Sequence, residues 1–385
     1  MSPSLRFPEF TGEWEECKVS DLLDFYPTNS LSWDKLEYGT NAIQNLHYGL
    51  IHVGLPTMVD LSKDKLPNVV NGNTPKNYEL CQEGDVAFAD ASEDTNEVAK
   101  AVEFYNLNGN KAICGLHTIH GRDNHQRTIV GYKGYAFSSI SFHHQIRRIA
   151  QGTKIYSINC KNFSECYVGI PSKEEQSKIA TLLRLIDERI AVQNRLIEKY
   201  ESLIKALRHH LFSTLESVKE VPVADLLSYE QPTKYIVSDT EYSNNTDLTP
   251  VLTANKAFIL GYTDEVEGIY DKGPCIILDD FTLDFKIVEF PFKVKSSAIK
   301  ILSAKTTVSL RYIFEYLKFL DLNTEEHKRH YIAEIEPMSI ELPEEDTIKS
   351  IAFLFDLMDK RRKGLERDQQ LLKSQKDYLL REIFI

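Results

Sequence analysis

Side chains able to contact the phosphates and base edges of a nucleic acid gather in short, loop-like stretches of the sequence. The first half of the chain carries His117, Arg122 and Asn124 in one glycine-containing stretch, and Lys154 with Tyr156 in another. Such side chains meet phosphate oxygens and base edges, and loops let them enter a groove. Each stretch taken alone is more typical of a solvated surface, so a role in DNA contact must be argued from its position in the chain.

The second half of the chain repeats this arrangement. Lys328, Arg329 and His330 form one basic run, and Lys295 with Ser296 belongs to another. Like the earlier run at 154–156, the run at 329–331 lies a little upstream of a proline that begins a predicted helix. A basic position that recurs in both halves is a stronger signal than one basic run, so these residues are our candidates for DNA contact.

Motifs of several enzyme classes are absent from the sequence. There is no G-x-x-x-x-G-K-[ST] phosphate loop, no H-E-x-x-H, no G-x-S-x-G, and no N-P-P-Y or D-P-P-F run of an amino-methyltransferase. Asp280, Asp284 and Lys286 resemble the acidic strand and D-x-K tripeptide that hold Mg²⁺ in nucleases. That tripeptide is common by chance and its spacing here is short, so we favour a structural role and predict no catalytic residue.

The cysteines indicate neither a metal centre nor a disulfide framework. The six lie at positions 17, 81, 114, 160, 166 and 275, with no C-x-x-C pair. Zinc sites and disulfide-rich domains usually show closely spaced pairs. We therefore predict reduced, mostly buried thiols, no metal site and no cofactor bound by this chain.

Chain length and net charge limit the number of domains and the kinds of partner that the protein can have. The 385 residues suggest two or three domains. The chain has 45 Lys plus Arg against 57 Asp plus Glu, a net charge of −12, so any DNA contact must rest on local basic patches. No apolar run approaches the ~20 residues that cross a bilayer, and the N-terminus lacks a signal-peptide pattern. We expect a cytoplasmic protein without membrane contact.

A long internal repeat organises the chain. Residues 171–212 match residues 343–384 without a gap at a shift of 172 positions. Identical pairs in this match include Pro171/Pro343, Ile179/Ile351, Ala180/Ala352, Leu182/Leu354, Asp187/Asp359, Arg189/Arg361, Leu207/Leu379 and Phe212/Phe384. Apolar residues recur at alternating steps of four and three in both copies, which predicts two long helices with a heptad seam.

The starts and seams of the two helices differ. Ser172 and Glu175 form an S-x-x-E capping box in the first copy. The seam of the second copy is interrupted by Arg362, Gln369 and Lys376, which suggests contacts with a partner there. Each helix would span ~60 Å. We expect the two helices to pair with each other; pairing with another protein or with a second copy of this chain is the alternative.

The segments before each helix also correspond. The stretch GDVAFAD at 84–90 resembles GPCIILDD at 273–280, and short β-type runs separated by Asn, Gly and Pro fill both segments. We predict an α+β fold with two mixed α/β domains and two long antiparallel helices in a pseudo-twofold repeat. The predicted segments are 1–170, 171–213, 214–342 and 343–385, alternating globular domain and long helix.

These stretches together resemble the specificity subunit of Type I restriction–modification systems. The similar stretches include LRFPEFTGEWEECKVSDLL, GLHTI and GTKIYSINCKNFSECYVGIPSKEEQSKIATLLRLIDERI in the first half. In the second half they are SYEQPTKYIV, PVLTANKAFILGYT, LDDFT and FKVKSSAIKIL followed by HKRHYIAEIEPMSIELP. The resemblance covers essentially the whole chain.

The resemblance implies a non-catalytic subunit of a bacterial or archaeal complex. Each globular domain would be a target-recognition domain that reads one half of a split site in double-stranded DNA, and the helices would fix the gap. Two methylation subunits using S-adenosylmethionine and two restriction subunits using ATP and Mg²⁺ would be the partners. The alternatives are a coiled-coil scaffold that binds only proteins and, less favoured, a stand-alone nuclease.

Overall fold

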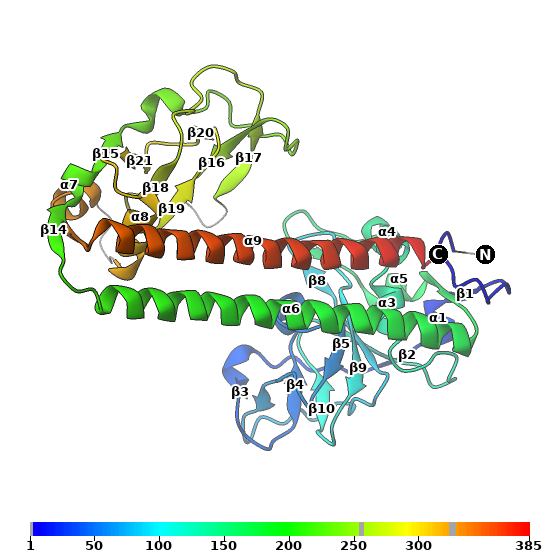
Figure 1. The fold of residues 1–385 in the computed structure, drawn as a ribbon. Helices are drawn as coiled ribbons and strands as arrows, with labels where there is room; N and C mark the ends of the chain where they lie inside the picture. Colours follow the sequence, from blue (N-terminus) through cyan, green and yellow to red (C-terminus); the bar gives the residue numbers. More distant parts are fainter. Residues whose placement is uncertain (1–2, 254–257, 323–328) are drawn as a thin grey trace. The chain divides into compact units, whose positions relative to one another are not determined.

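The computed structural model describes residues 3–253, 258–322 and 329–385. They form two compact units, which are treated separately below (Figure 1). Unit 1 comprises Met1–Asn194 and Arg367–Ile385, and unit 2 comprises Arg195–Glu366. Within the described ranges, every helix is too short or too polar to cross a membrane.

Unit 1 is built on a five-stranded sheet backed by a smaller one. The larger sheet has the order β2 (Asp24–Tyr26), β11 (Thr118–Arg122), β7 (Val86–Ala89), β9 (Ala101–Asn106) and β5 (Met58–Asp60), antiparallel except for the parallel pair β5–β9. The smaller sheet has the order β10 (Ala112–Cys114), β4 (Gln44–Leu46), β6 (Asn68–Val69) and β3 (Leu36–Glu37). Two short pairs, β1 (Glu15–Lys18) with β13 (Tyr167–Ile170) and β8 (Ala91–Ser92) with β12 (Tyr156–Ser157), complete the strands.

Strand β7 is buried on both faces because successive side chains of a strand point in opposite directions. Val86 and Phe88 enter one hydrophobic cluster with α3 and α5, and Ala87 and Ala89 enter a second cluster with β4 and β10. The helices of this unit, besides the long ones, are α1 (Val19–Leu22), α2 (Tyr48–His52), α3 (Lys133–Phe137), α4 (Ile140–Ile149), α5 (Cys160–Ser164) and the 3₁₀ turn η1 (Trp33–Lys35).

Unit 2 repeats this plan with fewer residues. Its main sheet has the order β15 (Leu227–Glu230), β21 (Ile299–Ala304), β18 (Cys275–Asp279) and β19 (Phe285–Val288). A second sheet has the order β17 (Ile259–Thr263), β16 (Thr249–Leu252) and β20 (Lys293–Val294), and β14 (Lys219–Pro222) pairs with β22 (Ser339–Leu342). The remaining elements are α7 (Val223–Leu226), α8 (Leu310–Phe319), the 3₁₀ turn η2 (Pro232–Tyr235) and the π turn η3 (Tyr331–Ile335).

The strand orders show that the internal repeat extends to the topology. The order β2-β11-β7-β9 of unit 1 corresponds to β15-β21-β18-β19 of unit 2, and β18 divides its side chains between two clusters as β7 does. The antiparallel pair β1–β13 corresponds to β14–β22. The predicted α+β fold with two mixed domains is confirmed.

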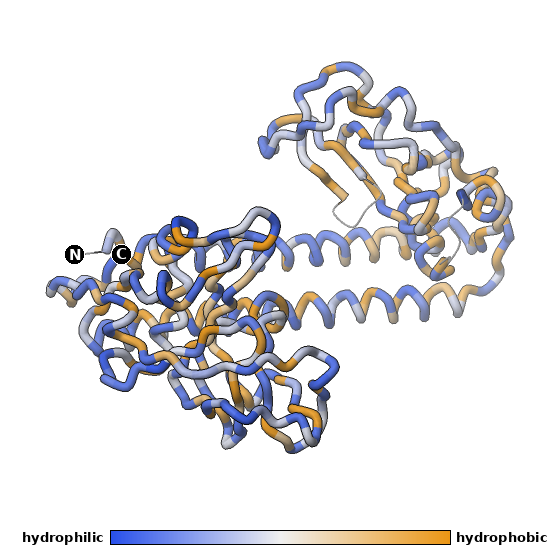
Figure 2. The backbone as a smooth tube through the Cα atoms, turned by 180° about the vertical axis from the view of Figure 1, so that it is seen from behind, coloured by the Kyte–Doolittle hydropathy of each residue, from blue (hydrophilic) through white to orange (hydrophobic). Residues whose placement is uncertain are grey.

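Two long helices, α6 (Lys173–Ser213) and α9 (Glu345–Glu382), are shared between the units, because the unit boundary cuts both of them. Apolar and polar residues alternate along each, as the colours in Figure 2 show. In unit 1, Ile179 and Leu183 of α6 share a cluster with Leu379 and Ile383 of α9. In unit 2, Phe212 shares a cluster with Phe355 and Met358 in the same way. The predicted pairing of the helices with each other is confirmed within each unit.

The polar residues of the α9 seam form ion pairs and hydrogen bonds within the chain. Lys376 pairs with Asp187 of α6 at 2.7 Å, and Gln369 donates a hydrogen bond to Asn194 of α6. Arg362 pairs with Asp359 and Glu366 on its own helix. At Gln369 and Lys376 the acceptors are supplied by α6, and contacts with a partner at the α9 seam stay a prediction.

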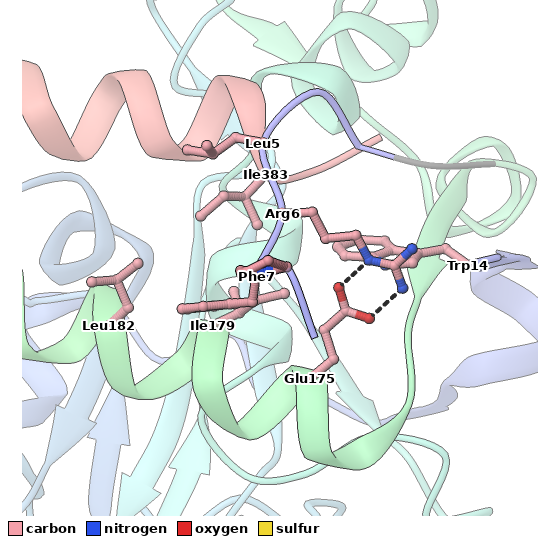
Figure 3. A pocket seen from close by; sticks show the side chains of 9 residues that line it. Leu5, Arg6, Phe7, Trp14, Glu175, Ile179, Leu182 and Ile383 are labelled. Carbon is pink, nitrogen blue, oxygen red and sulfur yellow. Dashed lines mark hydrogen bonds and ion pairs between the residues drawn. The ribbon is translucent and has the colours of Figure 1, made fainter. Parts of the chain in front are cut away.

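The start of α6 departs from the predicted capping box. The backbone N–H of Glu175 donates to Oγ of Ser172 at 3.3 Å, which is one of the two hydrogen bonds of a capping box. The carboxylate of Glu175 is instead held by both Nε and Nη2 of Arg6, each at 2.7 Å (Figure 3). A bidentate guanidinium pair is stronger than one backbone bond. The pair fixes the N-terminal arm over an apolar cavity of about 230 Å³, lined by Phe7, Trp14, Ile179 and Ile383 among others.

Candidate nucleic-acid interface

In unit 1, three loops meet at one end of the main sheet, where Asp90 directly follows β7. The backbone N–H of Asp90 donates to the carbonyl of His117, which precedes β11, and the N–H of Ile158 donates to the carbonyl of Asp90. His117 also bonds through Nδ1 to Oδ1 of Asp90 at 3.1 Å, and its side chain is 50% exposed. The contacts therefore place His117 beside the segment that contains Lys154 and Tyr156.

A tight hairpin presents Lys154. Gln151 and Ser157 exchange backbone hydrogen bonds of 2.9 and 2.8 Å and so close the loop at 151–157. Gly152 makes the turn with φ 136°, where a Cβ would overlap the carbonyl oxygen of Ile155. Lys154 is exposed at the turn and Ile155 is 62% exposed beside it. A lysine next to an exposed apolar side chain suits a phosphate contact combined with an apolar contact in a groove.

Tyr156 has a mixed environment. Its residue lies in β12, opposite Ser92 of β8, and its half-buried ring packs against the core cluster of unit 1. The tyrosine therefore anchors the hairpin to the domain. Its contacts support a positioning role for the lysine two residues earlier.

Two of the predicted residues of unit 1 lie at the opposite end of the sheet. Arg122 is the last residue of β11, whereas His117 precedes the first. Its guanidinium bonds to Asp85 at 2.8 and 2.9 Å, to Glu79 at 2.7 Å and to the carbonyl of Leu80 at 2.8 Å. These bonds raise the pKa of Arg122 further, hydrogen bonding to Asp85 being the largest cause. Arg122 is thus buried and fully paired, and its predicted DNA contact would require these bonds to open.

Asn124 lies near Arg122 and is also engaged. Its Nδ2 donates to Oδ2 of Asp24 at 2.6 Å and to the hydroxyl of Tyr26 at 2.8 Å. Both acceptors belong to β2, at the edge of the sheet. The structure therefore divides the five predicted residues of unit 1 into the group His117, Lys154 and Tyr156 and the distant pair Arg122 and Asn124.

Unit 2 has the equivalent convergence of loops at the end of β18. The N–H of Asp280 donates to the carbonyl of Ala298, and the N–H of His330 donates to the carbonyl of Asp280. The N–H of Lys295 donates to the carbonyl of Leu252 at 2.9 Å. Lys295 and Ser296 therefore lie in the β20–β21 loop beside the segment that contains Arg329 and His330.

Exposure separates the predicted residues of unit 2. Lys295, Ser296 and Arg329 are exposed. His330 is 1% exposed and its Nδ1 bonds to Oε2 of Glu334 at 2.9 Å, so its side chain belongs to the interior. Lys328 lies outside the described residues.

The carboxylates considered for a nuclease are held by the protein itself. Oδ1 of Asp280 accepts from the backbone N–H groups of His330 and Tyr331, and Lys300 lies 3.3 Å from Oδ2. Burial would raise the pKa of Asp284, but hydrogen bonds from Lys318 and Lys286 outweigh it and hold that pKa below its usual range. These contacts favour the structural role for both residues.

Residues outside the predicted set also lie at this end of unit 1. Nε2 of His52 bonds to the carbonyl of Ala91 at 2.9 Å, and Nζ of Lys100 donates to the carbonyl of His52. Arg147 of α4 is exposed and donates to Asn96 at 2.8 Å. The run at 143–148 is visibly basic in the sequence. No local sequence pattern, however, predicts that it lies beside the 92–100 loop.

The chain is similar in sequence to one known protein and in fold to solved structures. The chain is 43% identical over 132 residues to the Type I restriction enzyme EcoR124I/EcoR124II specificity subunit of Escherichia coli, a match that covers 33% of this chain and 32% of that subunit. The fold resembles the crystal structure of a Type I restriction–modification S subunit from M. genitalium, with a TM-score of 0.60, 15% identity, and 100% and 99% of the two chains covered. No family model matches the chain.

A second solved structure has a similar fold. It comes from work on complex assembly and conformational transition of the type I R-M system, with a TM-score of 0.57, 12% identity and 97% of both chains covered. The resemblance to Type I specificity subunits suggested by the sequence is confirmed by these matches.

Proposed function

We propose that this chain is the DNA-specificity subunit of a Type I restriction–modification complex. Each unit would read one half of a split site in double-stranded DNA, while α6 and α9 set the gap and help to dock two methylation and two restriction subunits. Those partners would use S-adenosylmethionine, ATP and Mg²⁺, and this chain would be non-catalytic. The observation that carries the proposal is the repeated strand order, with exposed basic residues on converging loops at the same sheet end in both units.

The geometry favours a specific set of contact residues. In unit 1 these are Lys154 at the hairpin turn, with Ile155 beside it, and His117 on the adjoining loop. In unit 2 they are Lys295 and Arg329, which are exposed. Loops carrying cations at one end of a rigid sheet can reach base edges while the sheet fixes their positions.

Charge predicts how the binding is shared. The net charge of −12 opposes approach to DNA, because like charges repel one another over a Debye length of ~10 Å in 0.1 M salt. Exposed lysine and arginine side chains would therefore supply the DNA contacts. Partner subunits would supply much of the electrostatic attraction to DNA. We expect the isolated chain to bind DNA weakly and the assembled complex to bind it tightly.

Mapping of N6-methyladenine in host DNA tests the proposal directly. Methylation is compared in the parent strain, in a strain lacking this gene, and in that strain complemented with the gene. We expect one split motif to lose methylation on deletion and to regain it on complementation.

An unchanged methylation pattern in a strain whose partner methylase is expressed would contradict the proposal. If the chain then co-purifies with partners that lack sequence-dependent DNA affinity, it is a scaffold. Metal-dependent cleavage by the purified chain alone would instead establish the nuclease alternative.

A further inference from the structure

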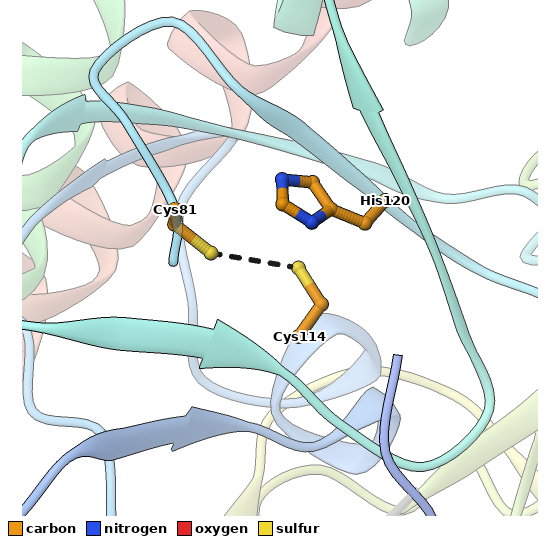
Figure 4. A group of neighbouring side chains, drawn as sticks. All are labelled: Cys81, Cys114 and His120. Atoms are coloured by element: carbon orange, nitrogen blue, oxygen red, sulfur yellow. Dashed lines mark hydrogen bonds between the residues drawn. The ribbon is translucent and has the colours of Figure 1, made fainter. Parts of the chain in front are cut away.

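Three side chains that are far apart in the sequence meet in the interior of unit 1. Cys81, Cys114 and His120 are all buried, and one ligand atom from each lies within 4.8 Å of the others (Figure 4). Within the described residues they are the group of cysteine, histidine and acidic side chains that meets this criterion. No local sequence pattern reveals the group, because it is formed by three different chain segments.

The sulfur atoms are spaced as two ligands of one tetrahedral ion would be. Sγ of Cys81 lies 3.7 Å from Sγ of Cys114. Zinc binds thiolate at ~2.3 Å, and the tetrahedral angle then separates two ligand sulfurs by about 3.8 Å. The backbone already holds this spacing, since the N–H of Cys81 donates to the carbonyl of Ala112 at 2.8 Å, two residues before Cys114 in β10.

The histidine is oriented as a metal ligand. Nε2 of His120 bonds to Oδ2 of Asp85 at 2.7 Å, and Asp85 is itself held by Arg122. Nδ1 of His120, in a residue with no exposed surface, lacks a hydrogen-bond partner in the described part of the chain. Figure 4 shows that this nitrogen points toward Sγ of Cys114. A carboxylate on one ring nitrogen and a free lone pair on the other is the usual arrangement of a zinc-bound histidine.

The surroundings suit a divalent ion. Two thiolates neutralise one Zn²⁺, and the neighbouring Asp85 is neutralised by Arg122. The amide nitrogen of the fully buried Asn45 is a second buried polar atom without a hydrogen-bond partner in the described part of the chain. The amide oxygen of Asn45 accepts from Asn29, which also donates to the carbonyl of Cys114. Zinc with three protein ligands completes its tetrahedron with water, whose oxygen can accept from a nearby amide.

We infer that Cys81, Cys114 and Nδ1 of His120 form a structural zinc site that joins the loop before β7, the end of β10 and the middle of β11. The site is independent of the proposed DNA contacts, because its role is to tie the two sheets of unit 1 together. Binding releases two thiol protons to solvent and makes three metal–ligand bonds without any redox step.

The test uses the purified full chain, stripped with a chelator under reducing conditions and then loaded with excess Zn²⁺ or Co²⁺ before gel filtration. We expect about one ion per chain, and for Co²⁺ the thiolate charge-transfer and tetrahedral d–d absorption bands. Cys81→Ser and Cys114→Ser should each weaken zinc binding at least tenfold and reduce the charge-transfer band. The matched control is Cys166→Ser, which removes a buried thiol of the same unit that bonds to Asn162.

The wild-type cobalt spectrum keeps the inference testable even if a variant misfolds. Retention of far less than one ion per chain by the folded wild type would overturn the inference. So would cobalt bands that persist unchanged in both serine variants, or a Cys81–Cys114 disulfide found by peptide mapping of wild-type chain purified without a reductant.

Discussion

At the scale of single residues, the same side-chain type serves opposite purposes according to what surrounds it. Arg122 and Lys154 were both predicted from chemistry, yet Arg122 is buried against Asp85 while Lys154 is exposed on a hairpin. The burial of Arg122 depends on a carboxylate 37 positions away. Sequence shows which residues can bind a phosphate, but long-range pairing decides which of them are free to do so.

Replacing Lys154 with alanine tests the proposed contact. In the assembled complex we expect a several-fold weaker affinity for DNA and a salt dependence lower by about one counterion, because one phosphate contact is lost. Titrations of labelled DNA at several salt concentrations measure both. The matched control is Lys63→Ala, since Lys63 follows β5 at the opposite end of the sheet. Equal effects of the two changes would remove Lys154 from the interface.

Glu230 predicts a pH dependence of the stability of unit 2. Burial raises its pKa, but hydrogen bonds from Lys234, Lys272 and Tyr235 outweigh burial and lower the pKa to about 2. Since the folded pKa lies below the unfolded value, this stabilisation is present above the unfolded pKa of about 4.5 and is lost as pH falls toward 2.

We therefore expect Glu230→Gln to destabilise unit 2 by about 1 kcal/mol at pH 7, after allowance for solvent screening of the exposed lysines. The difference from wild type should shrink between pH 5 and pH 2. Calorimetry at stepped pH measures it, with Glu289→Gln as the exposed control. A difference that is constant over this range would argue against the ion pairs as its source.

At the scale of elements, local periodicity was enough to predict the long helices and their seams. The bounds of α6 and α9 follow from apolar spacing that each segment contains within itself. Their polar contacts were not predictable in the same way. The hydrogen bond from Gln369 to Asn194, for example, depends on how the two helices face each other, which the spacing of apolar residues does not specify.

The hairpin that carries Lys154 depends on Gly152. Gly152→Ala introduces a Cβ that overlaps the carbonyl of Ile155, so the turn must open and Lys154 must move. We expect weaker DNA binding by the assembled complex with little change in unfolding temperature, because the turn is exposed. Gly109→Ala is the control: Gly109 also has a positive φ (74°) but nothing lies within 4 Å of its added Cβ. Wild-type affinity in the Gly152 variant would show that the turn does not position a contact.

The seam of α6 predicts a clear contrast between two leucines. Leu183 is fully buried in the core of unit 1, and Leu185 is 48% exposed on the same helix. Leu183→Ala should cost about 3 kcal/mol of unfolding free energy, and Leu185→Ala less than about 0.5 kcal/mol. Both tryptophans, Trp14 and Trp33, lie in unit 1, so their fluorescence during urea unfolding follows this unit alone. Similar losses for both variants would mean that the observed seam is wrong.

At the scale of the whole molecule, the internal repeat could be predicted from the sequence. The boundary between the two compact units could not. The shift of 172 residues predicted two similar halves, and the strand orders confirm them. The unit boundary at residues 194/195 and 366/367 has no sequence signal, because it reflects which contacts are dense in space. The cluster of Cys81, Cys114 and His120 could not be predicted from the sequence for the same reason, because its members meet only in the folded chain.

If the helices set the gap between the half-sites, lengthening both should lengthen the gap. Seven residues inserted after Asn194 and seven after Glu366 keep the heptad register and add about 10 Å, which equals about three base pairs. Methylation mapping should then find the same half-sites with a longer gap. Replacing the same stretches with heptads of equal length is the control. Efficient methylation at the original gap after insertion would contradict the role of the helices as spacers.

The division of α9 has a consequence for synthesis on the ribosome. The core of unit 1 includes Leu379, Leu380 and Ile383, and Trp14 meets Phe384 with ring centroids 6.3 Å apart. A nascent chain must therefore emerge beyond residue 384 before the first residues made can close their core. All of unit 2 is translated in that interval, so the part of the chain that is begun first is the part that is completed last.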